Sequence, residues 1–163
     1  MSDLRLRIVV VMLLSAILAF AITAGAQAEI IVEPAPGVAE LELVTEFDSY
    51  EADREIMAHL LCGECQSGSR ELQEAVGSVV LNRVESDDFP DTIEGVVFQK
   101  GQYACTWDGN YDREPTERNW EVAEYLLQNG SQIPDGVVFQ AQFKQGRIWK
   151  RIDNQIFCYG RGK

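Results

Sequence analysis

The chain has 163 residues, of which 26 are acidic and 14 are basic, and its formal net charge at pH 7 is −12. A chain this acidic repels the phosphate backbone of DNA and RNA, so nucleic acid is a poor candidate partner.

The first 28 residues have the pattern of a secretory signal peptide. The segment MSDLRLR is basic, residues 8–28 carry no charge, and Ala26-Gln27-Ala28 forms an A-x-A cleavage signal. An uncleaved membrane anchor is the alternative, because 21 uncharged residues could just span a bilayer. In both cases we expect an exported protein that is secreted, periplasmic or wall-associated and meets the membrane only through this segment.

The remaining chain is long enough for one compact domain. Its net charge is −13, because the first 28 residues carry two arginines and one aspartate. Residues 29–50 are strongly acidic and include Pro34 and Pro36, which predicts a flexible leader before a domain at 51–163. We expect this domain to be a monomer.

The cysteines Cys62, Cys65, Cys105 and Cys158 all lie in the predicted domain. An even number of cysteines in an exported chain predicts two disulfides. A zinc site made by all four thiolates is the rival, but the spacing lacks a second C-x2-C pair, so we expect no metal and no cofactor. Because Cys62 and Cys65 lie three residues apart in a predicted helix, each is expected to pair with Cys105 or Cys158.

Hydrophobic periodicity predicts helices first and strands last. Apolar residues recur at helical spacing from Ser49 through Leu61, and similar patterns at 69–84, 92–98 and 116–128 predict three further helices. The period then changes, and 137–143, 148–152 and 155–159 read as short strands. This order predicts an α+β fold with a helical lobe followed by a small antiparallel sheet.

Glu64 is the most unusual residue of the first predicted helix. On a helical wheel it falls between Leu60 and Leu61, inside the apolar stripe. A carboxylate in such surroundings is suited to general acid catalysis. Two structural interpretations of Glu64 compete with the catalytic one. In the first it is a buried glutamate held by an arginine such as Arg83, and in the second it stands at a helix end where the apolar stripe has reached solvent.

A resemblance favours the catalytic reading. From Glu64 on, the pieces EC, AVGSVVLNRV, DFPDTI and GQY follow one another in the order found in the SleB/CwlJ-type cell wall hydrolases, which include spore-cortex lytic enzymes. The resemblance covers about 105 residues and implies a lysozyme-like fold with one catalytic glutamate at a helix end. It implies cleavage of the peptidoglycan glycan strand between N-acetylmuramic acid and N-acetylglucosamine.

Glu64 takes the position of the family's catalytic glutamate. The resemblance implies that it protonates the glycosidic oxygen and then acts as a base towards the muramic 6-hydroxyl, giving a 1,6-anhydro product, or towards water. The family's second glutamate falls on Gly68, and a hydrolase with the usual mechanism needs a second carboxylate. We therefore favour a lytic transglycosylase over a hydrolase. The alternative is a wall-binding or structural module that has lost activity.

The resemblance also guides the remaining site predictions. The expected substrate contacts are Gln102 and Tyr103, in the GQY piece, and Trp107, Asp108 and Tyr111, in the segment after it. For the aromatic residues, and for Trp107 above all, the competing role is to anchor the loop through hydrophobic contacts. For Asp108 the competing role is to cap the loop. The pairing expected for the disulfides is Cys65 with Cys105 and Cys62 with Cys158.

Two features are left outside the leading hypothesis. His59 with Cys62 invites a cysteine-hydrolase reading, but His59 lies off the apolar stripe and the resemblance does not use it. Residues 144–163 carry six bases and one acid, which could attract anionic stem peptides or wall polymers. An ordinary solvated strand surface is the competing and favoured interpretation.

Overall fold

The computed structural model describes residues 36–160, with side chains from Phe47 on and for Thr45. The predicted signal segment and residues 29–35 of the predicted leader lie outside the described residues. The chain divides into two units, residues 1–45 and 46–163, and of the first unit only the helical backbone of residues 36–45 is described. Among the described residues, no helix combines the length and apolarity needed to cross a membrane.

The first described helix, α2 (Pro36–Cys65), begins earlier than the sequence predicts. Residues 36–50, predicted as a flexible leader, are helical instead. From Val38 to Phe47 the chain contains good helix formers such as Ala, Leu and Glu and neither glycine nor proline, which explains the difference. In the second unit, α2 buries Met57, Leu60 and Leu61 completely.

The central helix is α3 (Arg70–Val84), which contacts α4, α6 and the first strand. It begins at Ser69, whose hydroxyl accepts a hydrogen bond from the Leu72 amide at 3.1 Å, as an N-cap does. Helix α6 (Glu117–Asn129) packs so closely on α3 that a Cβ added at Gly77 would lie 2.4 Å from Leu126. Two short helices lie in the segment that connects α3 to α6, and they are α4 (Ile93–Val97) and α5 (Cys105–Asp108). The sequence predicts a loop where α5 stands.

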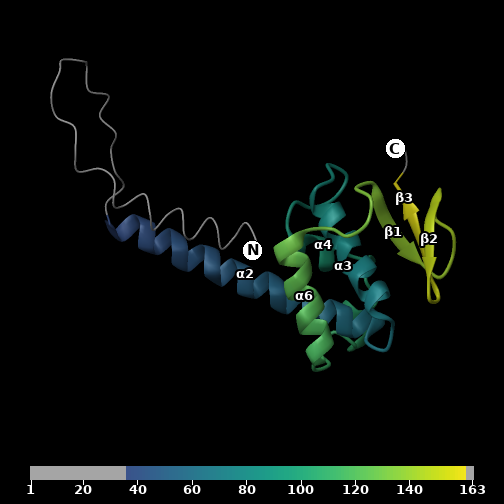
Figure 1. The fold of residues 1–163 in the computed structure, drawn as a ribbon, viewed down its shortest axis with the longest axis horizontal. Helices are drawn as coiled ribbons and strands as arrows, with labels where there is room; N and C mark the ends of the chain where they lie inside the picture. The colour runs from purple at the N-terminus through teal and green to yellow at the C-terminus, as the bar shows by residue number, and fades with distance from the viewer. Residues whose placement is uncertain (1–35, 161–163) are drawn as a thin grey trace, which may run out of the picture. The chain divides into compact units, whose positions relative to one another are not determined.

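Three antiparallel strands close the domain and form the sheet at the end of the chain in Figure 1. They are β1 (Val137–Ala141), β2 (Ile148–Ile152) and β3 (Gln155–Tyr159), in the spatial order β1-β3-β2. A tight turn at Asp153 and Asn154 joins β2 to β3, and Asp153 has a φ of 49°, which aspartate tolerates better than most residues. The predicted α+β order is confirmed, although β1 ends two residues earlier than predicted.

The predicted disulfides are wrong. Cys62, Cys65, Cys105 and Cys158 are all free and buried, so neither Cys65–Cys105 nor Cys62–Cys158 is formed. Each side chain has a separate environment: the Cys62 thiol lies 3.5 Å from the Glu114 carbonyl oxygen, and Cys105 packs against Gly63. A buried free cysteine behaves as a small apolar residue, and here the four thiols fill core positions.

Candidate functional site

Glu64 is the next-to-last residue of α2 and is partly exposed, because the helix ends one residue later. Its Oε1 accepts a hydrogen bond at 3.3 Å from the backbone amide of Cys105, the first residue of α5. Arg83 does not form the ion pair considered above; its Nε donates to the Val138 carbonyl at 2.8 Å instead. The carboxylate therefore stands at a helix end, with a backbone donor from a segment 41 residues away in the sequence.

The contact between Glu64 and Cys105 depends on Gly63. A Cβ added at Gly63 would lie 2.6 Å from the Cβ of Cys105 and 3.1 Å from its Sγ, so only glycine allows α5 to approach this closely. Burial, followed by the nearby Glu64 carboxylate, raises the pKa of the Cys105 thiol. A thiol that holds its proton in this way is a poor nucleophile.

Gln73 holds the end of α2 through two hydrogen bonds to backbone carbonyls. Its side chain is fully buried, and Nε2 donates to the carbonyl oxygens of Cys65 at 3.3 Å and Gln66 at 3.2 Å. The last carbonyls of a helix lack partners within the helix, so these two bonds fix the turn that follows Glu64. The sequence contains a signal for this role, because Gln73 falls beside Val80 on the buried face of α3, where a polar residue needs partners.

Tyr103, predicted as a substrate contact, is buried in the domain. Its side chain is 2 % exposed, and the Arg83 guanidinium lies 5.2 Å from the centre of its ring. Burial raises the pKa of Tyr103 to about 12; Arg83 opposes this shift, and Glu64 adds to it. In this structure Tyr103 offers no face to a ligand.

Three of the predicted contacts are exposed around α5: Gln102, Trp107 and Asp108. The Trp107 side chain is 60 % exposed, as an aromatic platform for a sugar would be. Asp108 Oδ1 accepts a hydrogen bond from the Asn110 amide at 2.9 Å, which is the loop-capping role considered as its alternative. These residues thus lie within three positions in the sequence of Cys105, whose backbone amide binds Glu64.

Tyr111 and His59 anchor the segment that follows α5. Tyr111 is partly buried, its ring lies 5.2 Å from that of Phe98, and burial raises its pKa to about 12. His59 Nδ1 lies 2.7 Å from the Tyr111 carbonyl oxygen, which only accepts hydrogen bonds, so this nitrogen carries the proton. His59 therefore ties α2 to the loop and is not placed as the base of a cysteine nucleophile.

Gly68, on which the resemblance places the second glutamate of the SleB/CwlJ-type enzymes, closes a tight turn. Its amide donates to the Cys65 carbonyl at 2.9 Å, and a Cβ there would lie 2.6 Å from Leu72 Cδ2. The nearest glutamates in sequence are held elsewhere. Glu71 pairs with Lys150 at 2.5 Å, and Glu74 pairs with Arg70 at 2.7 Å.

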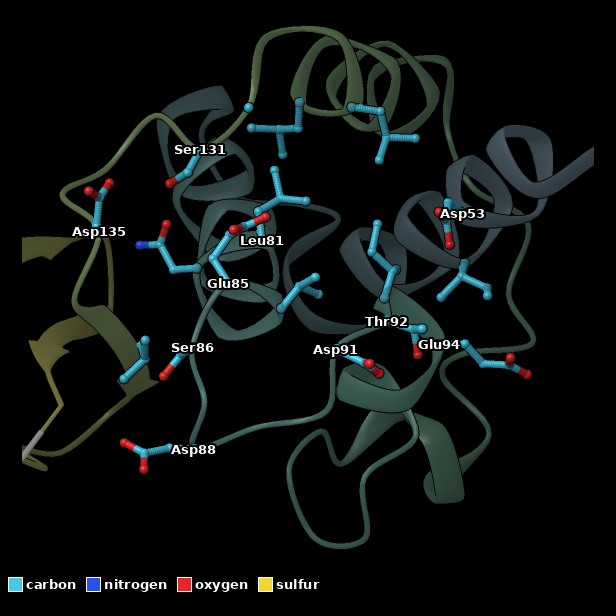
Figure 2. Close-up of a pocket in the computed structure, with 18 of the residues that line it drawn as sticks. Asp53, Leu81, Glu85, Ser86, Asp88, Asp91, Thr92, Glu94, Ser131 and Asp135 are labelled. Carbon is cyan, nitrogen blue, oxygen red and sulfur yellow. The ribbon is translucent and has the colours of Figure 1, made fainter. Parts of the chain in front are cut away.

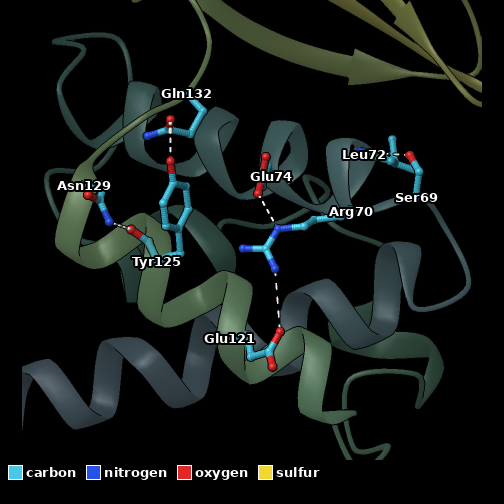
Figure 3. A network of polar contacts seen from close by, with 8 residues as sticks. All are labelled: Ser69, Arg70, Leu72, Glu74, Glu121, Tyr125, Asn129 and Gln132. Carbon is cyan, nitrogen blue, oxygen red and sulfur yellow. Dashed lines mark hydrogen bonds and ion pairs between the residues drawn. The ribbon is translucent and has the colours of Figure 1, made fainter.

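Figure 3 shows the ion pair between Arg70 and Glu74. Arg70 lies between Glu74 on its own helix and Glu121 on α6, with Nη1 of Arg70 3.6 Å from the Glu121 carboxylate. Glu74 therefore takes part in a surface network that links α3 to α6. Neither Glu71 nor Glu74 stands in for the missing glutamate in this arrangement.

A large cavity lies in a different part of the domain. It has a volume of about 1000 Å³, and Glu64 is not among its lining residues. Apolar residues such as Ile56, Leu81 and Leu126 line it together with several carboxylates, and Figure 2 shows the carboxylates distributed around it. These carboxylates belong to Asp53, Glu85, Asp88, Asp91, Glu94 and Asp135.

Burial, with a smaller effect of Glu94, raises the pKa of the cavity residue Asp53. Among the described residues, no group of three or more His, Cys, Asp or Glu side chains is placed to hold a metal ion.

The order of helices followed by a short antiparallel sheet agrees with the fold of known proteins. Residues 67–158 match the profile of the family described as Cell Wall Hydrolase, and the chain belongs to this family, in its SleB/CwlJ type. The matched range begins three residues after Glu64, so it includes the partners of this residue but not the carboxylate itself.

Among the similar proteins are spore cortex-lytic enzymes. That of Oceanobacillus iheyensis is 32 % identical over 114 residues, covering 65 % of this chain and 41 % of the relative. That of Bacillus cereus is 37 % identical over 116 residues, covering 65 % of this chain and 44 % of the relative. The chain thus spans less than half the length of these relatives.

Two solved structures share the fold. The catalytic domain of the germination-specific lytic transglycosylase SleB from Bacillus anthracis matches with a TM-score of 0.59 and 25 % identity, covering 65 % of this chain and 93 % of that one. The catalytic domain of the Bacillus cereus SleB protein matches with a TM-score of 0.60 and 21 % identity, covering 83 % and 99 %. The second likeness concerns the fold alone.

Proposed function

We propose that this protein cleaves the glycan strand of peptidoglycan between N-acetylmuramic acid and N-acetylglucosamine, with Glu64 as its single catalytic carboxylate. Membership of the cell wall hydrolase family supports the substrate class. The observation that carries the residue assignment is the hydrogen bond from the Cys105 amide to a partly exposed carboxylate at the end of α2. The predicted signal segment would export the protein to its substrate.

The reaction needs one group that gives a proton and then takes one back. Protonated Glu64 donates its proton to the glycosidic oxygen as the bond from that oxygen to the muramic anomeric carbon breaks. The resulting carboxylate then removes the proton of the muramic 6-hydroxyl while its oxygen bonds to the anomeric carbon. The product is a 1,6-anhydromuramic end, and Glu64 is protonated again.

The lytic transglycosylase route is favoured over hydrolysis because it needs no second carboxylate. Hydrolysis of the usual kind requires a second carboxylate as base or nucleophile. Glu71 and Glu74 are held in ion pairs, and Asp108 accepts a hydrogen bond from its own loop. In the transglycosylase reaction the substrate supplies the nucleophile, so one held carboxylate is sufficient.

Exposed residues of α5 and of the segment just before it complete the proposed cleft. Trp107 offers an aromatic surface on which a sugar ring can stack, and Gln102 and Asp108 offer polar groups for its hydroxyls. Tyr103 and Tyr111 support the cleft from within the fold.

The test is to digest purified peptidoglycan with the protein and identify the soluble muropeptides by mass. We expect 1,6-anhydro ends; reducing ends that contain an added water would show hydrolysis instead. Glu64→Gln should release nothing, whereas Glu55→Gln, an exposed carboxylate on the same helix, should behave as wild type. Release by the Glu64 variant would remove Glu64 from its assigned role.

A wall-binding module without activity is the second candidate, because Gly68 replaces the second glutamate of the family. Under this alternative the protein pellets with insoluble peptidoglycan and releases no muropeptides at any enzyme concentration.

A further inference from the structure

Positive and negative charge are separated along the folded domain. Residues 46–143 contain 20 acidic and six basic residues, whereas residues 144–160 contain four basic residues and one acidic residue. A domain with this excess of negative charge repels an anionic polymer on most of its surface. The short positive segment is therefore the part of the described domain that can attract one.

The fold places this positive segment at the edge of the sheet. In the order β1-β3-β2, β2 is an edge strand, and the cations stand on it and on the loop before it. We call this set the cationic edge, and all its members are exposed: Lys144, Arg147, Lys150 and Arg151. Lys150 pairs with Glu71, and the Arg147 guanidinium lies 3.7 Å from the centre of the Tyr159 ring. Within the described part of the chain, Lys144 and Arg151 form no ion pair.

The cationic edge is attached to the segment that follows Glu64. Asp153, in the turn between β2 and β3, accepts a hydrogen bond from the Ser69 amide at 3.0 Å. Lys150 reaches Glu71, two residues further on. Both contacts fix the hairpin to residues at the start of α3, which follow Glu64 by five and seven positions in the sequence.

We propose that the cationic edge binds the free carboxylates of the stem peptides that project from the glycan strand, and so orients the strand across Glu64. This inference rests on the proposed function for the identity of the polymer. Charge complementarity argues for the occupant: stem peptides are anionic, and this edge is the positive surface attached to the segment that follows the candidate catalytic carboxylate. Arg151 and Lys144 supply the charges that no acid of the described domain neutralises.

Binding can be measured apart from cleavage by using the Glu64→Gln variant, which leaves the polymer intact. Its sedimentation with insoluble peptidoglycan is followed at increasing salt concentration. We expect the added changes Lys144→Glu and Arg151→Glu to weaken binding by about three- to tenfold at low salt, since exposed charge pairs contribute little each. The loss should shrink as salt screens the interaction.

The matched control is Arg118→Glu, compared with Arg151→Glu alone. Arg118 is an exposed cation on α6, so both variants change the net charge equally. A larger loss for Arg151→Glu supports the proposal, whereas equal losses show a general charge effect and overturn it. If both variants keep full binding and Arg151→Glu self-associates, the charges serve only to prevent the exposed sheet edge from pairing with another strand. This outcome also overturns the proposal.

The chemistry of the ligand is tested on the polymer. Amidation of the peptidoglycan carboxylates should lower binding to the level of the double variant. If removal of phosphate-containing wall polymers has this effect and amidation does not, the ligand is phosphate and the proposal is wrong. A protein that releases no muropeptides but binds through the cationic edge would contradict the proposed function while supporting this inference.

Discussion

The end of α2 and the acidic cavity are opposite kinds of site. The cavity has a volume of about 1000 Å³ and six carboxylates around it, but no Lys or Arg is among the described residues that line it. The end of α2 has one partly exposed carboxylate; a backbone amide binds this carboxylate, and a buried glutamine holds the helix end. Acid–base chemistry requires a group whose position is fixed, so we assign function to the second region and not to the cavity.

The largest difference is expected from removing one carboxylate in each region. Glu64→Gln should lower the rate of muropeptide release by about 10²- to 10⁴-fold, the usual contribution of a general acid or base. Glu85→Gln, in the cavity, should leave the rate unchanged. The rates are compared by mass-based quantification of soluble muropeptides. A large loss with Glu85→Gln would move the active site to the cavity.

Gly63→Ala tests whether the close approach of α5 matters. The new Cβ would collide with Cys105, so we expect a loss of stability of about 1–3 kcal/mol together with a loss of activity per folded molecule. Gly77→Ala is the matched control, because its Cβ would collide with Leu126, which lines the cavity. It should destabilise the domain to a similar extent without changing the activity of the folded fraction. Denaturant unfolding and initial rates separate the two effects.

Gln73→Met should loosen the turn after Glu64. It removes the two donors to the carbonyls of Cys65 and Gln66, each worth about 0.5–1.5 kcal/mol, while keeping the volume of the side chain. We expect kcat to fall several-fold with KM nearly unchanged. Gln128→Met, which changes an exposed glutamine on α6, serves as the control. A change in KM alone would show that Gln73 acts on binding and not on the position of Glu64.

The smallest effect is expected from Asp53 in the cavity. Because burial raises its pKa in the folded state, the folded chain holds this proton to higher pH than the unfolded chain does. The contribution of Asp53 to stability should therefore rise as pH falls from neutral towards the ordinary aspartate pKa near 3.8. Asp53→Asn should raise Tm slightly at pH 7, flatten this rise and leave activity unchanged. Thermal unfolding at several pH values measures it, and a lower Tm for Asp53→Asn at pH 7 would contradict the assignment.

Local patterns in the sequence were sufficient for most of the fold. The periodicity around Leu72, Val76 and Val80 predicts α3 and its buried face, and the alternation before and after Asp153 predicts β2 and β3 at the bounds observed. These elements are determined by residues close in sequence, which is why a single chain reveals them.

Predictions that depended on distant contacts were less successful. An even number of cysteines cannot distinguish disulfides from buried thiols, because both suit the same residue type. Tyr103 was predicted to face the substrate, but its ring packs over Arg83 in the core. The hydrogen bond from the Cys105 amide to Glu64 and the hydrogen bond from Gln73 to the Cys65 carbonyl both arise from tertiary packing. Of these, only the bond from Gln73 has a signal in the sequence, because Gln73 is a polar residue on an apolar helix face.

The four buried thiols determine how the domain responds to redox chemistry. Burial, with a smaller effect of Glu64, raises the pKa of the Cys65 thiol to about 12, so almost none of it is thiolate at neutral pH. Thiol–disulfide exchange and alkylation both proceed through the thiolate and need access to solvent. The folded domain should therefore react slowly with iodoacetamide and keep its Tm in dithiothreitol. Its folding then requires no oxidase or disulfide isomerase.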